Sequence, residues 1–541
     1  MTTALDHLIF LPILLPLAAG ALMQFLDDRQ RSAKAIINVA VCLLMVVLAG
    51  RLVFEASMQG IDGELVATYP LGNWPVPFGI VLVADRLSDM MVLLTAILAI
   101  GALLFSLARW HSAGPSFHSL FQFLLMGLNG CFLTGDLFNL FVFFEVMLAA
   151  SYGLALHGAG SARVKAGLHY IAVNLVASSL FLIGAAMLYG VTGTLNMADI
   201  AARVPEIVGT DRGLLEAGAA VLGVAFLVKA GMWPLGFWLP TSYSAASAPA
   251  AAIFAIMTKV GVYALLRLSL LAFGIGAGAS AGFGQTSLLV GGMATIAFGA
   301  IGVLASQTTG RLAGYCVLIS SGTLLAAIGM GDAAVASGAL YYMVVSTLAI
   351  SAFFLLVELL ERVRVDAADV LAITMEAYGD DDEEAENDEI GLIIPATLAM
   401  LGVSFCICVL LLSSFPPLAG FLGKVAMISA MFNMGEPGVI PNAAWWLTAL
   451  LIVSGFATLI ALTRTGISTF WATMSESPAR VRVIEMAPIF MLLGVTLGLT
   501  IMAGPVMDYM QAAATSLYSP QDTIAAILDA PLVPVVREVT P

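Results

Sequence analysis

Three lysines lie inside long apolar stretches of the sequence, where an ionisable side chain costs about 2.5 to 3.5 kcal/mol. They are Lys229, Lys259 and Lys424, and the whole chain has only five lysines. A carboxylate, Glu145, lies near the middle of another apolar stretch, LFNLFVFFEVMLAASYGL at residues 137–154. Because buried amines and carboxylates can take up and release protons, the sequence predicts a proton relay built from these four side chains.

A glutamate and a lysine that approach and separate inside a membrane control where a proton stays. Burial favours the neutral form of each group, and a nearby opposite charge favours the charged form. Glu145 close to Lys229 would hold the lysine's proton, and separation would help to release it. A static pair that only fixes helix packing is the alternative, although apolar replacements often stabilise a protein as well as such a pair does. Lys259 and Lys424 have no matching acids, which favours the titrating interpretation.

The elements that carry these residues are membrane-spanning helices. The 541 residues are 60% hydrophobic and only 10% charged, against about 25% charged in a soluble domain. Apolar runs of about 20 residues recur from end to end, and each is long enough to cross about 30 Å of hydrocarbon as a helix. The first run has no signal-peptide pattern and is expected to be retained. We therefore expect an all-α polytopic membrane protein with about 14 transmembrane helices. Their expected centres are residues 16, 45, 97, 124, 146, 178, 224, 260, 296, 320, 348, 402, 452 and 496.

Basic residues in the connecting loops predict how these helices are oriented. Loops that follow odd-numbered helices hold twelve arginines and lysines, and the even loops with the C-terminal tail hold six. Since basic loops stay in the cytoplasm, both termini are expected outside. The acidic run EAYGDDDEEAENDE, within residues 376–390, is then cytoplasmic.

Helix breaks are predicted beside two of the lysines. Lys229 precedes AGMWPLGFWLP, which contains Pro234 and Pro240, and Lys424 follows SSFPPLAGF, which contains Pro416 and Pro417. Proline interrupts the backbone ladder, and such interruptions at membrane depth are tolerated only inside protein or beside water. Residues 64–88, ELVATYPLGNWPVPFGIVLVADRLS, have the composition of a short hairpin on the outer face.

Polar residues elsewhere are candidates for a water wire or for ion access. Asp136 precedes the Glu145 helix and either caps its N-terminus or helps ions reach the relay from outside. Tyr315, Ser346 and Ser351 lie in the tenth and eleventh predicted helices and are candidates to hold water, although Ser and Thr in membrane helices often bond their own backbone.

Cofactor chemistry is not indicated. The sequence has no haem, iron–sulfur, zinc or nucleotide-binding pattern, and the CxC pair Cys406 and Cys408 would point to different faces of a helix. We expect no metal, no cofactor and no nucleic-acid partner. No soluble catalytic domain is left over, so a transporter component is expected and an enzyme is not.

Four stretches resemble one known family, the antiporter-like membrane subunits of respiratory complex I, membrane-bound hydrogenases and Mrp-type cation/proton antiporters. They are FNLFVFFEVMLAASYGL, KAGMWPLGFWLP, MTKVGVYALLR and PPLAGFLGK. The Mrp type is the most similar, through stretches such as YPLGNWPVPFGIVLVADRLS. The resemblance implies Glu145 as the partner of Lys229, Lys259 as a central relay and Lys424 as the terminal proton site.

The resemblance also implies the organisation and partners of the chain. It implies one component of a hetero-oligomer in a bacterial inner membrane that exchanges cytoplasmic Na⁺ or K⁺ for external H⁺. It implies two inverted five-helix repeats with broken helices 7 and 12. The expected parts are 1–110 (helices 1–3 and the hairpin), 111–275 (helices 4–8), 280–466 (helices 9–13) and 467–541 (helix 14 and tail).

The sequence departs from the family pattern in two helices, and a second function stays open. Many relatives have a His and a Lys in the eleventh helix where this sequence has Ser346 and Ser351, and the tenth helix also differs. We therefore predict that hydroxyls and water bridge the gap between Lys259 and Lys424. The alternative function is a proton-pumping subunit of a redox complex, driven by electron transfer in a partner.

Overall fold

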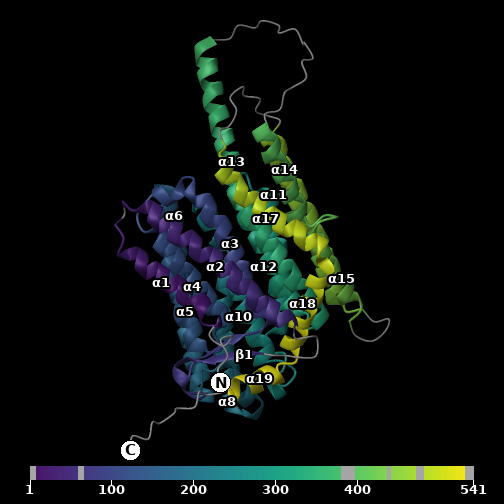
Figure 1. The fold of residues 1–541 in the computed structure, drawn as a ribbon. Helices are drawn as coiled ribbons and strands as arrows, with labels where there is room; N and C mark the ends of the chain where they lie inside the picture. Colours follow the sequence, from purple (N-terminus) through teal and green to yellow (C-terminus); the bar gives the residue numbers. More distant parts are fainter. Residues whose placement is uncertain are drawn as a thin grey trace, which may run out of the picture.

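Almost every segment of the computed structural model is helical, as expected for a chain that must satisfy its backbone hydrogen bonds inside a bilayer (Figure 1). The structure describes residues 8–27, 29–58, 66–378, 396–434, 440–470 and 481–530, with only the backbone of 363–378. Most of the predicted acidic loop, from residue 379 onward, lies outside these ranges. Within them, twelve helices are long and apolar enough to cross a membrane, and three shorter apolar helices accompany them.

The N-terminal part contains three helices and the predicted hairpin. Strand β1 pairs antiparallel with β2, with Ala67 opposite Ala84, which confirms the hairpin. Asp85 caps the next helix by accepting a hydrogen bond from Ser88 N at 2.8 Å, and it also pairs with the buried Arg267 at 2.8 Å. The hairpin is thereby tied to the centre of the molecule. The elements are α1 (Leu11–Gln24), α2 (Arg31–Met58), β1 (Ala67–Pro70), β2 (Val81–Ala84) and α3 (Arg86–Leu107).

The next set of helices carries Glu145, Lys229 and Lys259. Its fourth membrane helix is interrupted at residues 231–238, the first break, between α8 and α9. Gly231 ends α8 in the left-handed conformation (φ 75°), which glycine adopts without steric cost. The elements are α4 (Phe117–Leu133), α5 (Leu137–Leu156), α6 (Ser161–Thr192), α7 (Met197–Arg203), α8 (Thr210–Ala230), α9 (Leu239–Ala245) and α10 (Ala248–Leu271).

A second set follows the same order and carries Lys424. Its fourth membrane helix is interrupted at residues 414–418, the second break, between α14 and α15. Pro234, Pro416 and Pro417 lie in the two breaks as predicted. Pro240 instead lies in the first turn of α9, where a missing N–H leaves no bond unmade. The elements are α11 (Gln285–Ala305), α12 (Thr309–Gly329), α13 (Ala333–Tyr378), α14 (Ala396–Ser413), α15 (Ala419–Phe432) and α16 (Asn442–Phe470).

Three helices complete the chain: α17 (Val483–Ile501), α18 (Ala503–Tyr518) and α19 (Gln521–Leu528). Each of the fourteen predicted helix centres falls in a different helix, from α1 at residue 16 to α17 at residue 496. With α15 counted as the second part of the twelfth predicted helix, the expected all-α membrane fold is confirmed.

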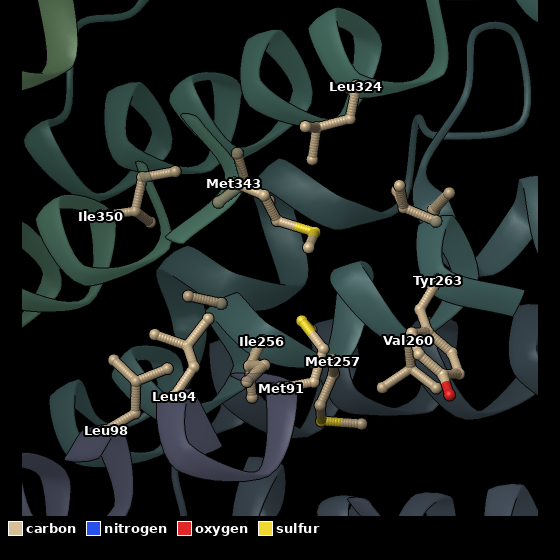
Figure 2. Packing of buried hydrophobic residues seen from close by; sticks show 14 of the residues in the cluster. Met91, Leu94, Leu98, Ile256, Met257, Val260, Tyr263, Leu324, Met343 and Ile350 are labelled. Carbon is tan, nitrogen blue, oxygen red and sulfur yellow. The ribbon is translucent and has the colours of Figure 1, made fainter. Parts of the chain in front are cut away.

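Helix α10 lies at the centre of the packed core, and its apolar span is fully buried. Figure 2 shows Ile256, Met257 and Val260 of α10 beside Met91 and Leu94 of α3, with Met343 of α13 and Leu324 of α12 close by. Lys259 lies in this same helix and is 0% exposed. The core therefore surrounds one of the predicted relay lysines with protein on every side.

Candidate functional site

Lys229 is held at the end of α8 by a side chain that the sequence did not single out. Its Nζ donates a hydrogen bond to Asn174 Oδ1 of α6 at 2.9 Å and lies 5.7 Å from the centre of the Phe144 ring. The lysine is buried, and Gly231 ends the helix two residues later. The amide oxygen of Asn174 is thus the acceptor that stabilises the ammonium group.

Glu145 and Lys229 do not form a direct ion pair in this structure. Glu145 Oε1 is buried without a hydrogen-bond partner. The glutamate shares a face of α5 with Phe138 and Val142, which are 51% and 40% exposed. It therefore lies toward the outside of this chain, whereas Lys229 points to Asn174. The predicted contact between the two is replaced by a separated pair.

Lys259 starts a hydrogen-bonded chain that crosses three helices. Its Nζ donates to Ser320 Oγ of α12 at 2.7 Å, and Ser320 Oγ is 2.9 Å from Ser346 Oγ of α13. All three side chains are buried. A hydroxyl can accept one proton and donate another, so the two serines can pass a proton from one to the next.

Lys229 and Lys259 lie close because α8 and α10 cross without side chains between them. A Cβ at Gly261 of α10 would lie 2.7 Å from Ala230 N and 3.1 Å from Lys229 Cβ. Only glycine allows this approach. The two lysines therefore belong to one buried site formed by adjacent helices.

Lys424 lies at the other end of the line in a less polar setting. Its Nζ is 3.4 Å from the carbonyl oxygen of Leu451 in α16 and 5.8 Å from the centre of the Tyr342 ring. A Cβ at Gly455 would lie 3.8 Å from that Nζ and 2.8 Å from Ser413 O. Gly455 thus leaves the space that the lysine occupies.

A cavity lies between the serine pair and the helices beside Lys424. About 10 Å³ of it is open to the centre of a water molecule, which is about what a single water requires. Its lining residues are Cys316, Ile319, Ser320, Tyr342, Ser346, Ile350, Leu411, Leu412 and Thr458. Three hydroxyls from three helices therefore face a space of the right size for the bridging water that we predicted from the sequence.

The remaining candidates lie away from this line. Asp136 caps α5 by accepting a hydrogen bond from Asn139 N at 2.8 Å. Burial raises the pKa of its carboxyl, and the backbone donors of the helix N-terminus oppose that shift. Tyr315 packs against Phe298 of α11, with ring centres 5.9 Å apart, on a different side of α12 from Ser320. Ser351 is fully buried, and its Oγ has no hydrogen-bond partner.

Asn174 is the functional residue that sequence reasoning missed. The signal was present, because an uncharged amide inside the apolar run GLHYIAVNLVASSLFL needs a hydrogen-bond partner when it is buried. Charge was the criterion that selected the other residues, and an amide has none. Among the described residues, His, Cys, Asp and Glu side chains do not gather in threes as metal ligands would.

Comparisons with known proteins agree with this geometry. Residues 134–456 match the family model for the transmembrane region of NADH:quinone oxidoreductase and Mrp antiporters. A protein of Rhizobium meliloti, named as a probable K(+)/H(+) antiporter subunit of class D, is 58% identical over 98% of this chain and 99% of its own length. A protein of Bacillus subtilis, named as an Na(+)/H(+) antiporter subunit of the same class, is 34% identical over 97% of this chain and 100% of its own.

Solved structures show the same fold. A chain of the Mrp complex of Dietzia sp. DQ12-45-1b has a TM-score of 0.81 at 23% identity, with 97% of this chain and 100% of that chain covered. A chain of respiratory complex I from Thermus thermophilus has a TM-score of 0.72 at 22% identity, with 94% and 99% covered.

The fold and the buried lysines define the class as an antiporter-like membrane subunit, and the chain belongs to the NADH:quinone oxidoreductase/Mrp antiporter family. Within the family, the relatives matched along their whole length share one subunit class of cation/proton antiporters, the class denoted D. The resemblance inferred from the relay motifs is confirmed.

Proposed function

We propose that this chain is the proton-translocating class D component of a multisubunit cation/proton antiporter, exchanging cytoplasmic K⁺ for external H⁺. The observation that carries the proposal is the buried line Lys229–Asn174, Lys259–Ser320–Ser346 and Lys424. The relative at 58% identity is named for K⁺, and those at 33% and 34% are named for Na⁺. K⁺ is therefore the first cation to test.

Proton movement along the line follows from its hydrogen bonds. A proton on Lys259 passes to Ser320 as that hydroxyl releases its own proton to Ser346, and a water in the adjacent cavity carries it toward Lys424. Lys259 is refilled from Lys229, its neighbour across the contact between α8 and α10. Every step uses groups that the core keeps away from bulk water, so leakage through the line is suppressed.

Glu145 acts on this line from its edge. Because the helix face that carries it is partly exposed in the isolated chain, we propose that a neighbouring subunit of the hetero-oligomer covers it. An added charge or a conformational change there would bring Glu145 closer to Lys229 or move it away. Glu145 thus sets the proton affinity of Lys229 and is not itself the carrier.

The location and organisation are proposals on the same basis. The excess of basic residues in the odd loops supports both termini outside a bacterial inner membrane. The breaks occupy corresponding places in the sets α4–α10 and α11–α16, which supports two inverted repeats. The redox-complex alternative is supported by likeness of fold alone, and the names of the long relatives favour the antiporter.

The test is cation-driven proton exchange in everted membrane vesicles that hold the complete complex. We expect exchange with K⁺, weaker exchange with Na⁺, and loss of exchange in Glu145→Ala, Lys229→Ala and Lys424→Ala. Lys165→Ala, at an exposed position on α6, is the matched control. Wild-type exchange in all three assembled variants would refute the relay, and loss of assembly in Glu145→Ala would favour the static-pair alternative.

A further inference from the structure

The first helix break is fastened to a neighbouring helix by one threonine. Trp233 N, in the break, donates a hydrogen bond to Thr295 Oγ1 of α11 at 2.9 Å. The same hydroxyl donates to Gly291 O of its own helix at 2.6 Å. Thr295 is 0% exposed, so water does not replace either bond. One hydroxyl therefore links the backbone of the break to the backbone of α11.

The second break has the same arrangement with a different helix. Ala419 N, at the start of α15, donates to Thr500 Oγ1 of α17 at 3.0 Å. Thr500 in turn donates to Thr496 O of its own helix at 3.0 Å. Ala419 N belongs to the first turn of α15, where backbone donors have no partner inside the helix. Thr500 supplies that partner.

These two threonines behave differently from most other buried hydroxyls in the described helices. Thr95 and Thr323, for example, donate only to the carbonyl four residues earlier in their own helix. That local bond is the common use of threonine in membrane helices. Thr295 and Thr500 keep the local bond and use a lone pair to accept a second one, from a segment that is not helical or is just beginning a helix.

Small residues bring the breaks close enough for these bonds. A Cβ at Gly291 would lie 2.4 Å from Met232 Sδ in the first break, and one at Gly322 of α12 would lie 2.9 Å from Thr295 Cβ. In the second break, a Cβ at Gly420 would lie 2.6 Å from Leu411 O. Each break is thus packed directly against its neighbours, with little freedom to shift once its hydrogen bond is made.

We propose that Thr295 and Thr500 are positioning residues for transport, each holding one break so that the adjacent lysine stays aligned with the relay. Lys229 lies four residues before Trp233, and Lys424 lies five residues after Ala419. The first fastening joins the Lys229 break to α11, the first helix of the second set. The second joins the Lys424 break to α17, outside both sets. This inference rests on the proposed function, since alignment matters only if these lysines carry protons.

The experiment compares Thr295→Val and Thr500→Val with Thr295→Ser and Thr500→Ser in vesicles that hold the complete complex. Valine keeps the shape and removes the acceptor, and serine keeps the hydroxyl. Exchange rates are measured against pH and cation concentration and normalised to the amount of assembled complex. Thr95→Val is the control, because its hydroxyl bonds only its own helix.

We expect the valine variants to lose about tenfold in maximal rate, with a shifted pH of half-maximal activity and an unchanged apparent KM for the cation. The serine variants and Thr95→Val should keep the wild-type profile. Valine variants with a wild-type rate and pH profile would overturn the inference. So would serine variants that lose as much as valine, because that result would show a role in packing alone.

The same preparation separates this inference from the proposed function. If Lys229→Ala and Lys424→Ala are inactive while both valine variants are normal, the relay stands and the positioning role fails. If the assembled lysine variants remain active, the proposed function fails whatever the threonine variants do.

Discussion

Lys229 and Lys424 lie beside equivalent breaks but on opposite sides of them. Lys229 is in the last turn of α8, before its break, and donates to a side-chain amide at 2.9 Å. Lys424 is in the second turn of α15, after its break, and its one hydrogen-bond partner among the described residues is a backbone carbonyl at 3.4 Å. The partial negative charge at a helix C-terminus stabilises a cation within the last turn, which reaches Lys229 and not Lys424.

The difference gives the relay a direction. The surroundings of Lys229 are built to keep a proton until Glu145 or Asn174 changes position. The surroundings of Lys424 offer weaker support to a charge, which suits a site that must release its proton. Two lysines beside similar breaks therefore have different tasks, and substitutions should affect them unequally.

The largest expected difference comes from replacing each lysine by arginine, which stays protonated in proteins. Lys424→Arg should reduce exchange by about a hundredfold or more, the range for loss of a proton-transfer group. Lys229→Arg should lose less, because Glu145 and Asn174 can still act on a fixed charge. Exchange in vesicles measures both. Equal losses in the two variants would break the comparison.

Removing the hydroxyl between the two ends should have the next largest effect. Ser320→Val breaks the chain from Lys259 to Ser346 and leaves a buried ammonium without its acceptor. We expect a loss of about tenfold in rate, and Ser320→Thr should retain most of it. The rates per assembled complex decide. A fully active valine variant would show that protons take another path.

Adding a charge beside Lys229 should shift the pH profile by a smaller amount. In Asn174→Asp the new carboxylate would lie where the amide oxygen now accepts the lysine's hydrogen bond. It would favour the protonated lysine, so release would require fewer protons in solution and the pH of half-maximal exchange should move upward. A titration of exchange rate against pH measures the shift, and Asn174→Leu, with no charge, should not show it. A downward shift would contradict the assigned acceptor.

Ser351 should be the least sensitive of the predicted water-wire residues. Its Oγ has no partner, so Ser351→Ala removes no bond, and we expect less than about a twofold change in rate. Ser351→Leu, in contrast, inserts carbon into a fully buried site and should impair exchange through overpacking. A large loss in the alanine variant would place Ser351 on the water path.

The sequence predicted the helices, the breaks and the buried lysines because each depends on local chemistry. A 20-residue apolar run, a proline pair or a lysine in hydrocarbon has much the same consequence in any fold. The contacts were harder, because they depend on how each helix is rotated about its axis. Tyr315 and Ser320 are five residues apart, about 140° around α12, and only Ser320 faces Lys259.

Glu145 shows the same limit from the other side. Its charge correctly identified it as an ionisable residue in an apolar helix, and the pairing with Lys229 was the simplest way to satisfy both charges. The rotation of α5 instead turns it toward the exposed face with Phe138 and Val142. A single sequence does not show which faces a neighbouring protein covers, so this placement required the structure.

Helix α13 differs from the two broken helices in a way that has a mechanical consequence. It continues from its apolar span, Ala333–Arg362, to Tyr378 without a proline, and it projects beyond the neighbouring helices in Figure 1. At about 1.5 Å per residue its 46 residues exceed the thickness of the bilayer core. A broken helix absorbs displacement at its joint, whereas an unbroken one transmits it as a rod. Ser346 is mounted on that rod, so a push or twist at its projecting end would lengthen or restore the 2.9 Å contact with Ser320 deep in the membrane.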